Sequence, residues 1–596
     1  MYHMDSNNII IITSKNVELG KNYTVLPLTN QDEIKISTCP NSKIKCYQEK
    51  SDRLCIIGHP FYGEIIDNNK FAERYFLLDK NNKKLTNING EFLLIETKQN
   101  SDYLRIVNCR FGSPIFWYYA QRNIFIGSTS YYHLALLLKK NNLFKISRMA
   151  FYEFINYRRL FDEKTYDLGT KYLKPASTLT YSGNNLDVKR YWSISYQDNQ
   201  CSFDSNVNNF IYSLKQSIKR KTSDNKRFGL MLSGGMDTRT ILAAFDENPP
   251  HCFNLTYSKN SREYKVAKVL TNSINADFSW IKIDNEHESK YLNESIKTTG
   301  GMYMTPSLFL GHSAQIQGSV DTILAGYGFD YFFQGMYLPM KDYKIIHPGI
   351  WIRRLHKIKG SIAEHFINHI SYKTRGLPVQ NLIKNKIRSE LYEQFYNTIT
   401  SIIEQASSLT DNIYRIWEHI SLGDLSRHIT YGGQLELMTL SEYRGIAYDN
   451  DLYELYSSLP TLHRYDAKIM RRALKIMNPL FYNHISANTG HPIKYSTNIR
   501  LLYRILDGIK MKTGIVKKNS DLPDNFARTW LPIEYVLRNQ MMKNVISLKD
   551  SSEIDSLNII DMDELRKNID LWAEGKIIGD QTFFVLLIVD YLIKSS

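Results

Sequence analysis

The stretch FGLMLSGGMDTRTILAAF, residues 228–245, decides the fold, because an apolar run breaks at Ser-Gly-Gly and then resumes with helical spacing. Phe228–Leu232 predicts a short buried strand, and Thr238–Phe245 predicts a helix with one apolar face. The loop between them opens onto a helix N-terminus, where N–H groups favour an anion. Gly234 and Gly235 allow the backbone to turn sharply and approach that anion. On this loop alone, an ordinary strand-turn-helix corner remains an open alternative.

A second stretch repeats this design. Phosphate is the anion that such a loop commonly binds. Asp237 follows the first loop, and its carboxylate would repel a phosphate unless the carboxylate and the phosphate bind the same Mg²⁺. In TILAGYGFDYFFQG, residues 322–335, an apolar strand is followed by Gly326, Gly328 and the acid Asp330. Two such loops at the carboxyl ends of two strands predict a nucleotide site in an open α/β sheet, with both aspartates as candidate Mg²⁺ ligands. The sequence contains no GxxxxGK[ST] pattern, which indicates a class of ATP site other than the Walker type.

Four motifs resemble, in order, those of the asparagine synthetase family of ATP pyrophosphatases. They are SGGMDT (233–238), GYGFD (326–330), SEYRGIAYDNDLYELYSSLP (441–460), and Lys468 with Arg472 in DAKIMRRAL. Tyr327 stands where the family usually has Glu, which is similar to β-lactam synthetase and carbapenam synthetase. The resemblance implies a C-terminal doubly wound parallel-sheet domain with helical additions that uses ATP and Mg²⁺.

The amino-terminal third resembles the glutaminase domain of the same family, over residues 89–138 and 172–192. This resemblance implies an Ntn-hydrolase-like β-sandwich of the α+β type. Glutamine-hydrolysing members carry Cys directly after the initiator Met, whereas this chain begins Met-Tyr-His-Met-Asp and its first cysteine is Cys39. We therefore expect an inactive glutaminase-like domain at 1–200 and a synthetase domain at 201–596, divided near the polar, turn-rich SYQDNQCSFDSN.

The resemblance also implies the roles of particular residues. Nucleotide contacts are expected from Leu232, Ser233, Gly234, Gly235, Met236, Asp237, Thr238, Asn254, Thr256, Tyr257, Gly326 and Gly328. Tyr327 is the candidate base for the attacking amine, with Glu364 as its candidate partner; the alternative is that Tyr327 is only an aromatic contact. Asn488 occupies the position of a family lysine, and Lys494 is the candidate replacement.

The amino-acid composition limits the classes of protein and of binding partner that remain possible. The chain has 596 residues with 43% apolar and 23% charged side chains, which is typical of a multidomain globular protein. The formal charge of +15 would attract RNA, a phosphorylated substrate or an acidic carrier, although solvated helix faces explain basic clusters equally well. No nucleic-acid-binding motif accompanies these clusters, so nucleic acid is disfavoured as a partner.

Three further expectations concern cysteines, the C-terminal run and one insertion. The six cysteines lack CxxC spacing and predict buried thiols in a cytoplasmic protein. The apolar run at 582–593 is too short to span a bilayer and predicts a buried closing helix, so no membrane span is expected. Residues 336–421 predict a mostly helical, basic elaboration.

These observations predict an ATP-dependent ligase that forms AMP and pyrophosphate. It would adenylate a carboxylate and join it to an amine or close a ring, in natural-product or surface-polysaccharide biosynthesis. The expected partners are a small-molecule or peptide carboxylate and an amine, with a carrier or precursor peptide as a further candidate. Two alternatives remain: an SGGxD-type RNA-modifying enzyme, and a nucleotide-binding scaffold without catalysis. The sequence does not predict the oligomeric state.

Overall fold

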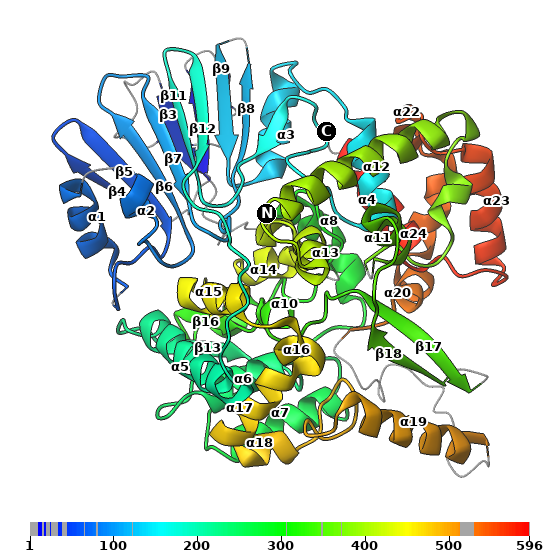
Figure 1. Cartoon of the computed structure of the whole chain (residues 1–596). Coiled ribbons are helices and arrows are strands. Elements are labelled where there is room, and N and C mark those ends of the chain that lie inside the picture. Colours follow the sequence, from blue (N-terminus) through cyan, green and yellow to red (C-terminus); the bar gives the residue numbers. More distant parts are fainter. Residues whose placement is uncertain are drawn as a thin grey trace.

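The structure, a computed structural model, describes residues 10–14, 17–19, 24–25, 34–38, 44–64, 66–78, 82–121, 123–305, 307–346, 350–370, 372–512 and 530–594. Two antiparallel sheets stand beside a parallel sheet, and most of the helices lie around the parallel sheet and to one side of the antiparallel pair (Figure 1). This arrangement confirms the predicted mixed α/β class. The domain boundary near residue 200 stays a prediction.

The amino-terminal part contains two six-stranded antiparallel sheets. The first has the order β10-β8-β9-β1-β3-β2, with β1 (Ile10–Ser14), β2 (Thr24–Val25), β3 (Ile34–Thr38), β8 (Trp117–Gln121), β9 (Ile124–Ser128) and β10 (Thr170–Tyr172). The second has the order β12-β11-β7-β6-β5-β4, with β4 (Lys45–Glu49), β5 (Asp52–Gly58), β6 (Phe92–Lys98), β7 (Leu104–Asn108), β11 (Ser177–Ser182) and β12 (Asn185–Arg190).

Side chains that alternate along these strands fill the space between the two sheets. Ile10 and Ile12 of β1 belong to one buried cluster with Leu93 and Ile95 of β6. This period of two is what a strand with one face in a core requires. The helices of this part are α1 (Asn68–Leu77), α2 (Asn82–Leu85), α3 (Tyr131–Lys140) and α4 (Arg148–Tyr157).

The second part is built on a five-stranded parallel sheet in the order β15-β14-β13-β16-β19. Its strands are β13 (Phe228–Met231), β14 (His251–Thr256), β15 (Phe278–Lys282), β16 (Thr322–Ala325) and β19 (Glu442–Gly445). The predicted strand at 228–232 is thus present one residue shorter. The chain moves outward from β13 in one direction to β14 and β15, and in the other direction to β16 and β19. The order reverses between β13 and β16, where open α/β sheets place their ligands.

Both faces of this sheet are buried. Leu230 and Leu324 belong to one core cluster, whereas their neighbours Met231 and Ile323 belong to another. Hydrophobic residues on consecutive positions are what a parallel strand covered on both faces requires. The surrounding helices are α5 (Phe203–Lys221), α6 (Asp237–Ala243), α7 (Arg262–Asn272), α8 (His287–Thr299), α9 (Ser313–Gln317), α10 (Phe329–Phe332), α15 (Asn450–Ser458), α16 (Thr461–Arg464), η4 (Tyr465–Ala467), α17 (Lys468–Met477), α18 (Pro479–Asn483) and α19 (Thr497–Lys512).

Most of the regular structure in the insertion after α10 is helical, as expected for 336–421, but the segment also contains two strands that were not expected. It begins with an antiparallel hairpin of β17 (Met340–Ile346) and β18 (Ile350–Leu355). The β-branched and aromatic residues that begin IWIRRL favour a strand. The helical remainder comprises α11 (Ile362–His369), η2 (Val379–Leu382), α12 (Asn385–Ser407), α13 (Ile413–Leu422), η3 (Leu425–Arg427) and α14 (Tyr431–Leu437).

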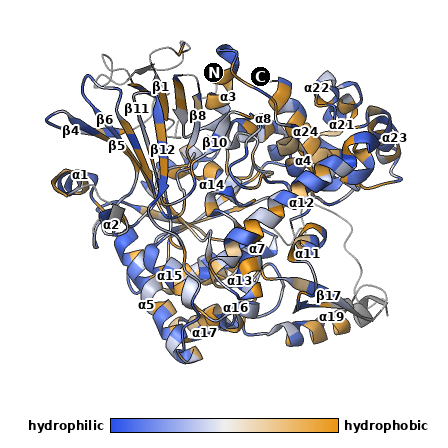
Figure 2. Cartoon of the chain, turned by 45° about the horizontal axis from the view of Figure 1, so that its top comes forward, coloured by the Kyte–Doolittle hydropathy of each residue, from blue (hydrophilic) through white to orange (hydrophobic). Residues whose placement is uncertain are grey.

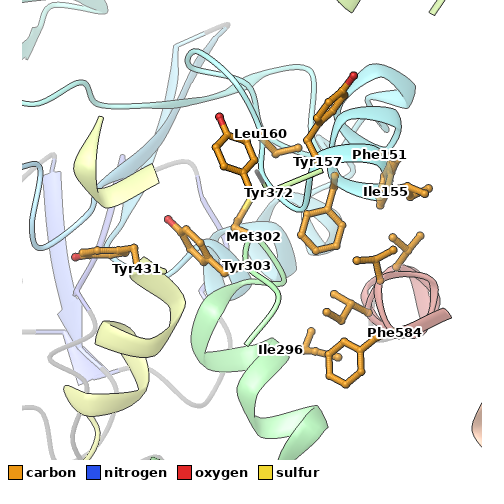
Figure 3. Packing of buried hydrophobic residues seen from close by; sticks show 14 of the residues in the cluster. Phe151, Ile155, Tyr157, Leu160, Ile296, Met302, Tyr303, Tyr372, Tyr431 and Phe584 are labelled. Atoms are coloured by element: carbon orange, nitrogen blue, oxygen red, sulfur yellow. The ribbon is translucent and has the colours of Figure 1, made fainter. Parts of the chain in front are cut away.

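The C-terminal helices return to the amino-terminal part. They are α20 (Ile533–Gln540), α21 (Met542–Ser547), η5 (Leu548–Asp550), α22 (Ser552–Ser556), α23 (Met562–Ala573) and α24 (Asp580–Lys594). α24 is largely hydrophobic (Figure 2) and packs against α4 and α8. Figure 3 shows Phe584 of α24 near Ile296 of α8, with Phe151 and Ile155 of α4 in the same cluster. The predicted buried closing helix is therefore present.

Two cysteines are not free thiols, which corrects the expectation for all six. Cys46 of β4 and Cys55 of β5 form a disulfide. The hairpin places these residues directly opposite each other, with their Cα atoms 4.1 Å apart. Cys109 and Cys252 are buried thiols as expected, Cys201 is an exposed thiol, and Cys39 lies outside the described residues.

Among the helices that the structure describes, none is long and apolar enough to cross a membrane.

Replacing Phe584 by Ala should lower the free energy of unfolding by about 3–5 kcal/mol, because its ring is lost from a core that holds three helices together. Its exposed fraction is only 3%, whereas Leu77, at 82%, offers a control in Leu77→Ala. Urea unfolding followed by fluorescence measures both variants. A Phe584→Ala midpoint equal to that of Leu77→Ala would contradict the packing of α24.

Candidate active site

The two glycine-containing loops meet at the carboxyl ends of β13 and β16. A Cβ atom on Gly326 would lie 2.9 Å from Asp237 Cβ and 3.1 Å from the Thr238 nitrogen, so no larger side chain fits there. Gly328 has a φ of 100°, which other residues rarely adopt. These two positions bring Asp330, in the first turn of α10, to the same cavity as Asp237.

The first loop is closed by its own side chains. Thr238 Oγ1 accepts a hydrogen bond from the Ser233 N–H at 3.0 Å, and the Gly235 N–H donates to Ser233 Oγ at 3.2 Å. The Gly234 N–H instead donates to Glu263 Oε1 at 2.6 Å. Gly234 therefore faces the protein interior, whereas Ser233, Gly235 and Met236 line the cavity.

A buried arginine holds this loop against a distant segment. Arg239 is fully buried and donates to the carbonyl oxygens of Gly234 at 3.0 Å and Ile485 at 2.7 Å. It also donates to the carbonyl oxygen of Phe481 at 3.0 Å. Burial lowers the pKa of Arg239 to about 10, although the negative charge of Glu263 acts in the opposite direction and raises it. The residues that follow Ile485 consequently form the opposite wall of the cavity.

The two aspartates dominate the electrostatics of the cavity. Burial, followed by the charge of Asp330, raises the pKa of Asp237 well above its usual value. Burial raises the pKa of Asp330 to about 7, although hydrogen bonds from the backbone oppose this shift. Gln334 Nε2 donates to Asp237 Oδ1 at 2.5 Å. Two carboxylates this poorly solvated and this close resist being charged together.

The cavity has a volume of about 300 Å³. Its acidic wall comes from the two loops and α10, and the facing wall comes from the segment between α18 and α19. The lining residues are Ser233, Gly235, Met236, Asp237, Asp330, Gln334, Met336, Ser486, Asn488, Thr489, Pro492, Ile493 and Arg500.

Tyr327, on the second loop, contacts α14, the helix that carries a buried carboxylate. A Cβ atom on Gly433 would collide with the Tyr327 hydroxyl, so α14 contacts this tyrosine through a glycine. Glu436, one turn further along α14, is fully buried, and its Oε1 accepts hydrogen bonds from the Ser295 and Thr305 hydroxyls, both at 2.8 Å. Burial raises the pKa of Glu436 to about 7. Burial and then the Glu436 charge raise the pKa of Tyr327.

Glu364 and Lys494 do not lie where the sequence analysis expects them. Glu364 is exposed in the first turn of α11, where its N–H donates to Ser361 Oγ. No interaction between Glu364 and Tyr327 is found among the described residues, and the carboxylates whose charges raise the pKa of Tyr327 are Glu436 and, to a lesser extent, Asp330. Lys494 is exposed and is not part of the cavity lining.

The expected adenine-side residues lie at the end of β14, outside the cavity lining. Asn254 Nδ2 donates to the Leu232 carbonyl oxygen at 2.9 Å and links the ends of two strands. Thr256 Oγ1 accepts a hydrogen bond from Trp280 Nε1 at 2.8 Å, and the Tyr257 hydroxyl donates to Glu288. The side chains of Thr256 and Tyr257 are therefore engaged within the protein, and their role in nucleotide binding stays a prediction.

The donor set at the acidic wall suits Mg²⁺. Two half-buried carboxylates that line one cavity supply the hard oxygen ligands that this cation prefers. No group of three or more His, Cys, Asp or Glu side chains within the described residues is arranged to hold a metal. Asp237 and Asp330 would accordingly hold Mg²⁺ together with ligands from a substrate, such as phosphate oxygens.

The sequence analysis does not identify four residues that the structure makes candidates for a role in the site. Gln334 follows Asp330 by four residues, so helical spacing could have indicated it. Arg239, Glu436 and Arg500 carry no comparable signal, because their partners lie far away in the sequence.

Comparison with known proteins gives a family model that matches the part of the chain that carries the two glycine loops. Residues 210–475 match the family model described as asparagine synthase. Asparagine synthetase [glutamine-hydrolyzing] 3 of Bacillus subtilis (strain 168) is 27% identical over 121 residues, which cover 19% of this chain and 19% of that protein. The chain thus matches less than a fifth of the length of this relative. The family match contains both glycine loops, Glu436 and Lys468.

Two solved structures give much weaker likenesses. A structure of the allosteric regulatory enzyme of purine biosynthesis has a TM-score of 0.20 and 6% identity, covering 56% of this chain and 70% of that chain. Glutamine phosphoribosylpyrophosphate amidotransferase from B. subtilis has a TM-score of 0.19 and 7% identity, covering 56% and 71%. TM-scores this low carry no conclusion about the fold, and the Ntn-hydrolase-like assignment stays a prediction.

Asp330 should make the thermal stability depend on pH. Its pKa is about 7 in the folded protein against a usual value of 3.8, so its contribution is fully present below pH 4 and is lost as the pH rises through 7. Asp330→Asn should therefore raise the melting temperature at pH 8 and change it less at pH 5. Excess Mg²⁺ should raise the pH 8 melting temperature of the unsubstituted protein more than that of the variant.

Asp246→Asn supplies the control for this comparison, because the Asp246 side chain is 73% exposed. It should alter neither the pH dependence nor the response to Mg²⁺. An Asp330→Asn variant that melts at a lower temperature than the unsubstituted protein at pH 8 would contradict the assignment.

Proposed function

We propose that the protein is an ATP-dependent amide-bond synthetase that adenylates a carboxylate and releases pyrophosphate. The observation that carries this proposal is the meeting of Asp237 and Asp330 in one cavity at the switch point of the parallel sheet. The match of residues 210–475 to the asparagine synthase model supports the same reaction class.

The loop residues would bind and orient the nucleotide. Ser233, Gly235 and Met236 border the cavity and offer a hydroxyl and backbone groups to phosphate oxygens. Asp237 and Asp330 would hold Mg²⁺, which neutralises phosphate charge when it is bound. Gln334 orients Asp237, so one carboxylate keeps a defined position beside the other.

Amide formation needs a group that removes a proton from the amine, and we assign this role to Tyr327 with Glu436. The raised pKa of Tyr327 keeps the phenol protonated near neutral pH, so it cannot act alone. The phenol oxygen would take the amine proton while its own proton passes to Glu436, whose pKa is about 7. The C–N bond then forms, and the bond between the acyl carbon and AMP breaks.

The substrate assignment rests on the same reaction class. A small-molecule or peptide carboxylate and an amine, from two molecules or from one that closes into a ring, would meet in this cavity. A carrier or precursor peptide is a further candidate partner, in natural-product or surface-polysaccharide biosynthesis. Glutamine independence and a cytoplasmic location stay predictions.

Removal of either aspartate should abolish Mg²⁺-dependent ATP binding. Asp237→Ala and Asp330→Ala should each weaken binding of Mg·ATP by at least about 100-fold, since a buried charged ligand is lost. Isothermal titration calorimetry with ATP, in the presence and absence of Mg²⁺, measures this effect. Asp246→Ala serves as the control. Unchanged affinity in both cavity variants would exclude the metal assignment.

Loss of the proton acceptor should separate the two half-reactions. Tyr327→Phe and Glu436→Gln should each reduce amide formation by about 10²-fold or more, while substrate-dependent exchange of pyrophosphate into ATP persists. Adenylation precedes proton removal from the amine, so exchange does not need the pair. Glu364→Gln is the matched control and should affect neither activity.

Equal losses of exchange and amide formation in Tyr327→Phe would assign the tyrosine to nucleotide binding or packing. Binding of Mg·ATP without exchange for any candidate carboxylate would favour the nucleotide-binding scaffold.

A further inference from the structure

The wall that faces the two aspartates carries one positive charge. Among the described residues that line the cavity, Arg500 alone is cationic. Asn488, at the position of the family lysine, also lines this wall but is neutral. Lys494, the other nearby candidate, is exposed and lies outside the lining. The lining of the cavity therefore combines two carboxylates with one guanidinium.

Asp466 fixes the position of Arg500. Arg500 Nη2 donates to Asp466 Oδ1 at 2.7 Å, with side-chain exposures of 26% and 13%. The same carboxylate accepts from the Thr497 backbone N–H at 3.1 Å and from the Thr497 hydroxyl at 2.6 Å. It also accepts from Arg471 Nη2 at 3.0 Å. Asp466 thus binds the first residue of α19 and the arginine one turn later, which orients the start of this helix.

A chain of hydrogen bonds connects Asp466 with the acidic wall. Asp466 and Ala467 adopt left-handed conformations, with φ values of 56° and 52°. The Ala467 N–H donates to the Gln334 carbonyl oxygen at 3.2 Å, and the Gln334 side chain donates to Asp237 at 2.5 Å. Arg500 is consequently held at a set place relative to the Mg²⁺ ligands, although it lies far from them in the sequence.

We propose that Arg500, positioned by Asp466, binds the pyrophosphate part of the nucleotide in this cavity and supplies the cation that Asn488 lacks. The inference rests on the proposed function. A guanidinium pairs with phosphate oxygens through directed, charge-assisted hydrogen bonds, and its five N–H donors allow it to bind Asp466 and a phosphate together. Mg²⁺ on the aspartates and Arg500 across the cavity would then contact the same phosphate groups from opposite sides.

Calorimetry on the full chain with three probes tests this assignment. Arg500→Ala should weaken the binding of Mg·ATP and of magnesium pyrophosphate by about 10- to 100-fold, which is the usual range for one charge-assisted hydrogen bond. Binding of AMP should stay within twofold, because AMP lacks the phosphates that the arginine contacts. Arg500→Lys should recover part of the loss. Arg566→Ala, which removes an exposed arginine of α23, should leave all three affinities unchanged.

The positioning role of Asp466 requires a double-mutant comparison. Asp466→Asn should weaken pyrophosphate binding when Arg500 is present and should add little to Arg500→Ala, because its effect passes through the arginine. A purely structural role for Asp466 would lower the affinity for AMP as well and would add fully in the double variant.

The outcomes separate this inference from the proposed function. Absence of Mg·ATP binding in the unsubstituted protein would overturn the proposed function and the inference together. Normal binding in both the unsubstituted protein and Arg500→Ala would overturn the inference alone. Loss of pyrophosphate binding in Lys494→Ala, with Arg500→Ala unaffected, would assign the cation to Lys494 instead.

Discussion

The close contact of two loops at Gly326 is the constraint on which the site depends. β13 and β16 are neighbours in the sheet, but the chain leaves them toward opposite edges, so their loops open at the switch point. Only a residue without a side chain fits at 326 against Asp237 and Thr238. The contact brings two half-buried carboxylates to one cavity, and their raised pKa values follow from partial burial and, for Asp237, from the neighbouring charge of Asp330. The same geometry costs stability near neutral pH, and it places two oxygen donors where the proposed Mg²⁺ would bind.

The amino-terminal sandwich is joined to the parallel sheet through buried polar contacts. Glu91 accepts hydrogen bonds from the Gly445 N–H at 2.7 Å and from the Ser113 hydroxyl at 3.0 Å. Lys221 lies 3.9 Å from Glu91 and donates to the carbonyl oxygens of Gly445 and Tyr448. Charges buried this deeply are tolerated only when their partners stay in place, so removal of one partner is costly. The sandwich therefore helps to hold the end of β19, whatever its own activity.

The cavity is assembled from segments that are distant in the sequence. Arg239 binds the carbonyl oxygens of both the first loop and the segment before α19, which sets the width of the cavity. Gln334 uses its side chain on Asp237 and its carbonyl oxygen on Ala467, so it connects the acidic wall with the segment that carries Arg500. Gly433 leaves room for the Tyr327 hydroxyl near Glu436. The first two contacts each depend on one side chain, and the third depends on a glycine, which has no side chain.

Local sequence patterns were enough to predict the strands β13 and β16, the glycine loops after them and the meeting of Asp237 with Asp330. These features depend on apolar runs, on glycine and on the rule that parallel strands end at one edge, all of which are local or general. The contact of Tyr327 with Gly433 of α14, the place of Arg500 in the cavity lining and the Cys46–Cys55 disulfide needed the tertiary structure. The physical reason is that burial and opposing partners decide these interactions. An exposed glutamate on α11 and a buried glutamate on α14 have the same side chain, and only packing gives the second a raised pKa.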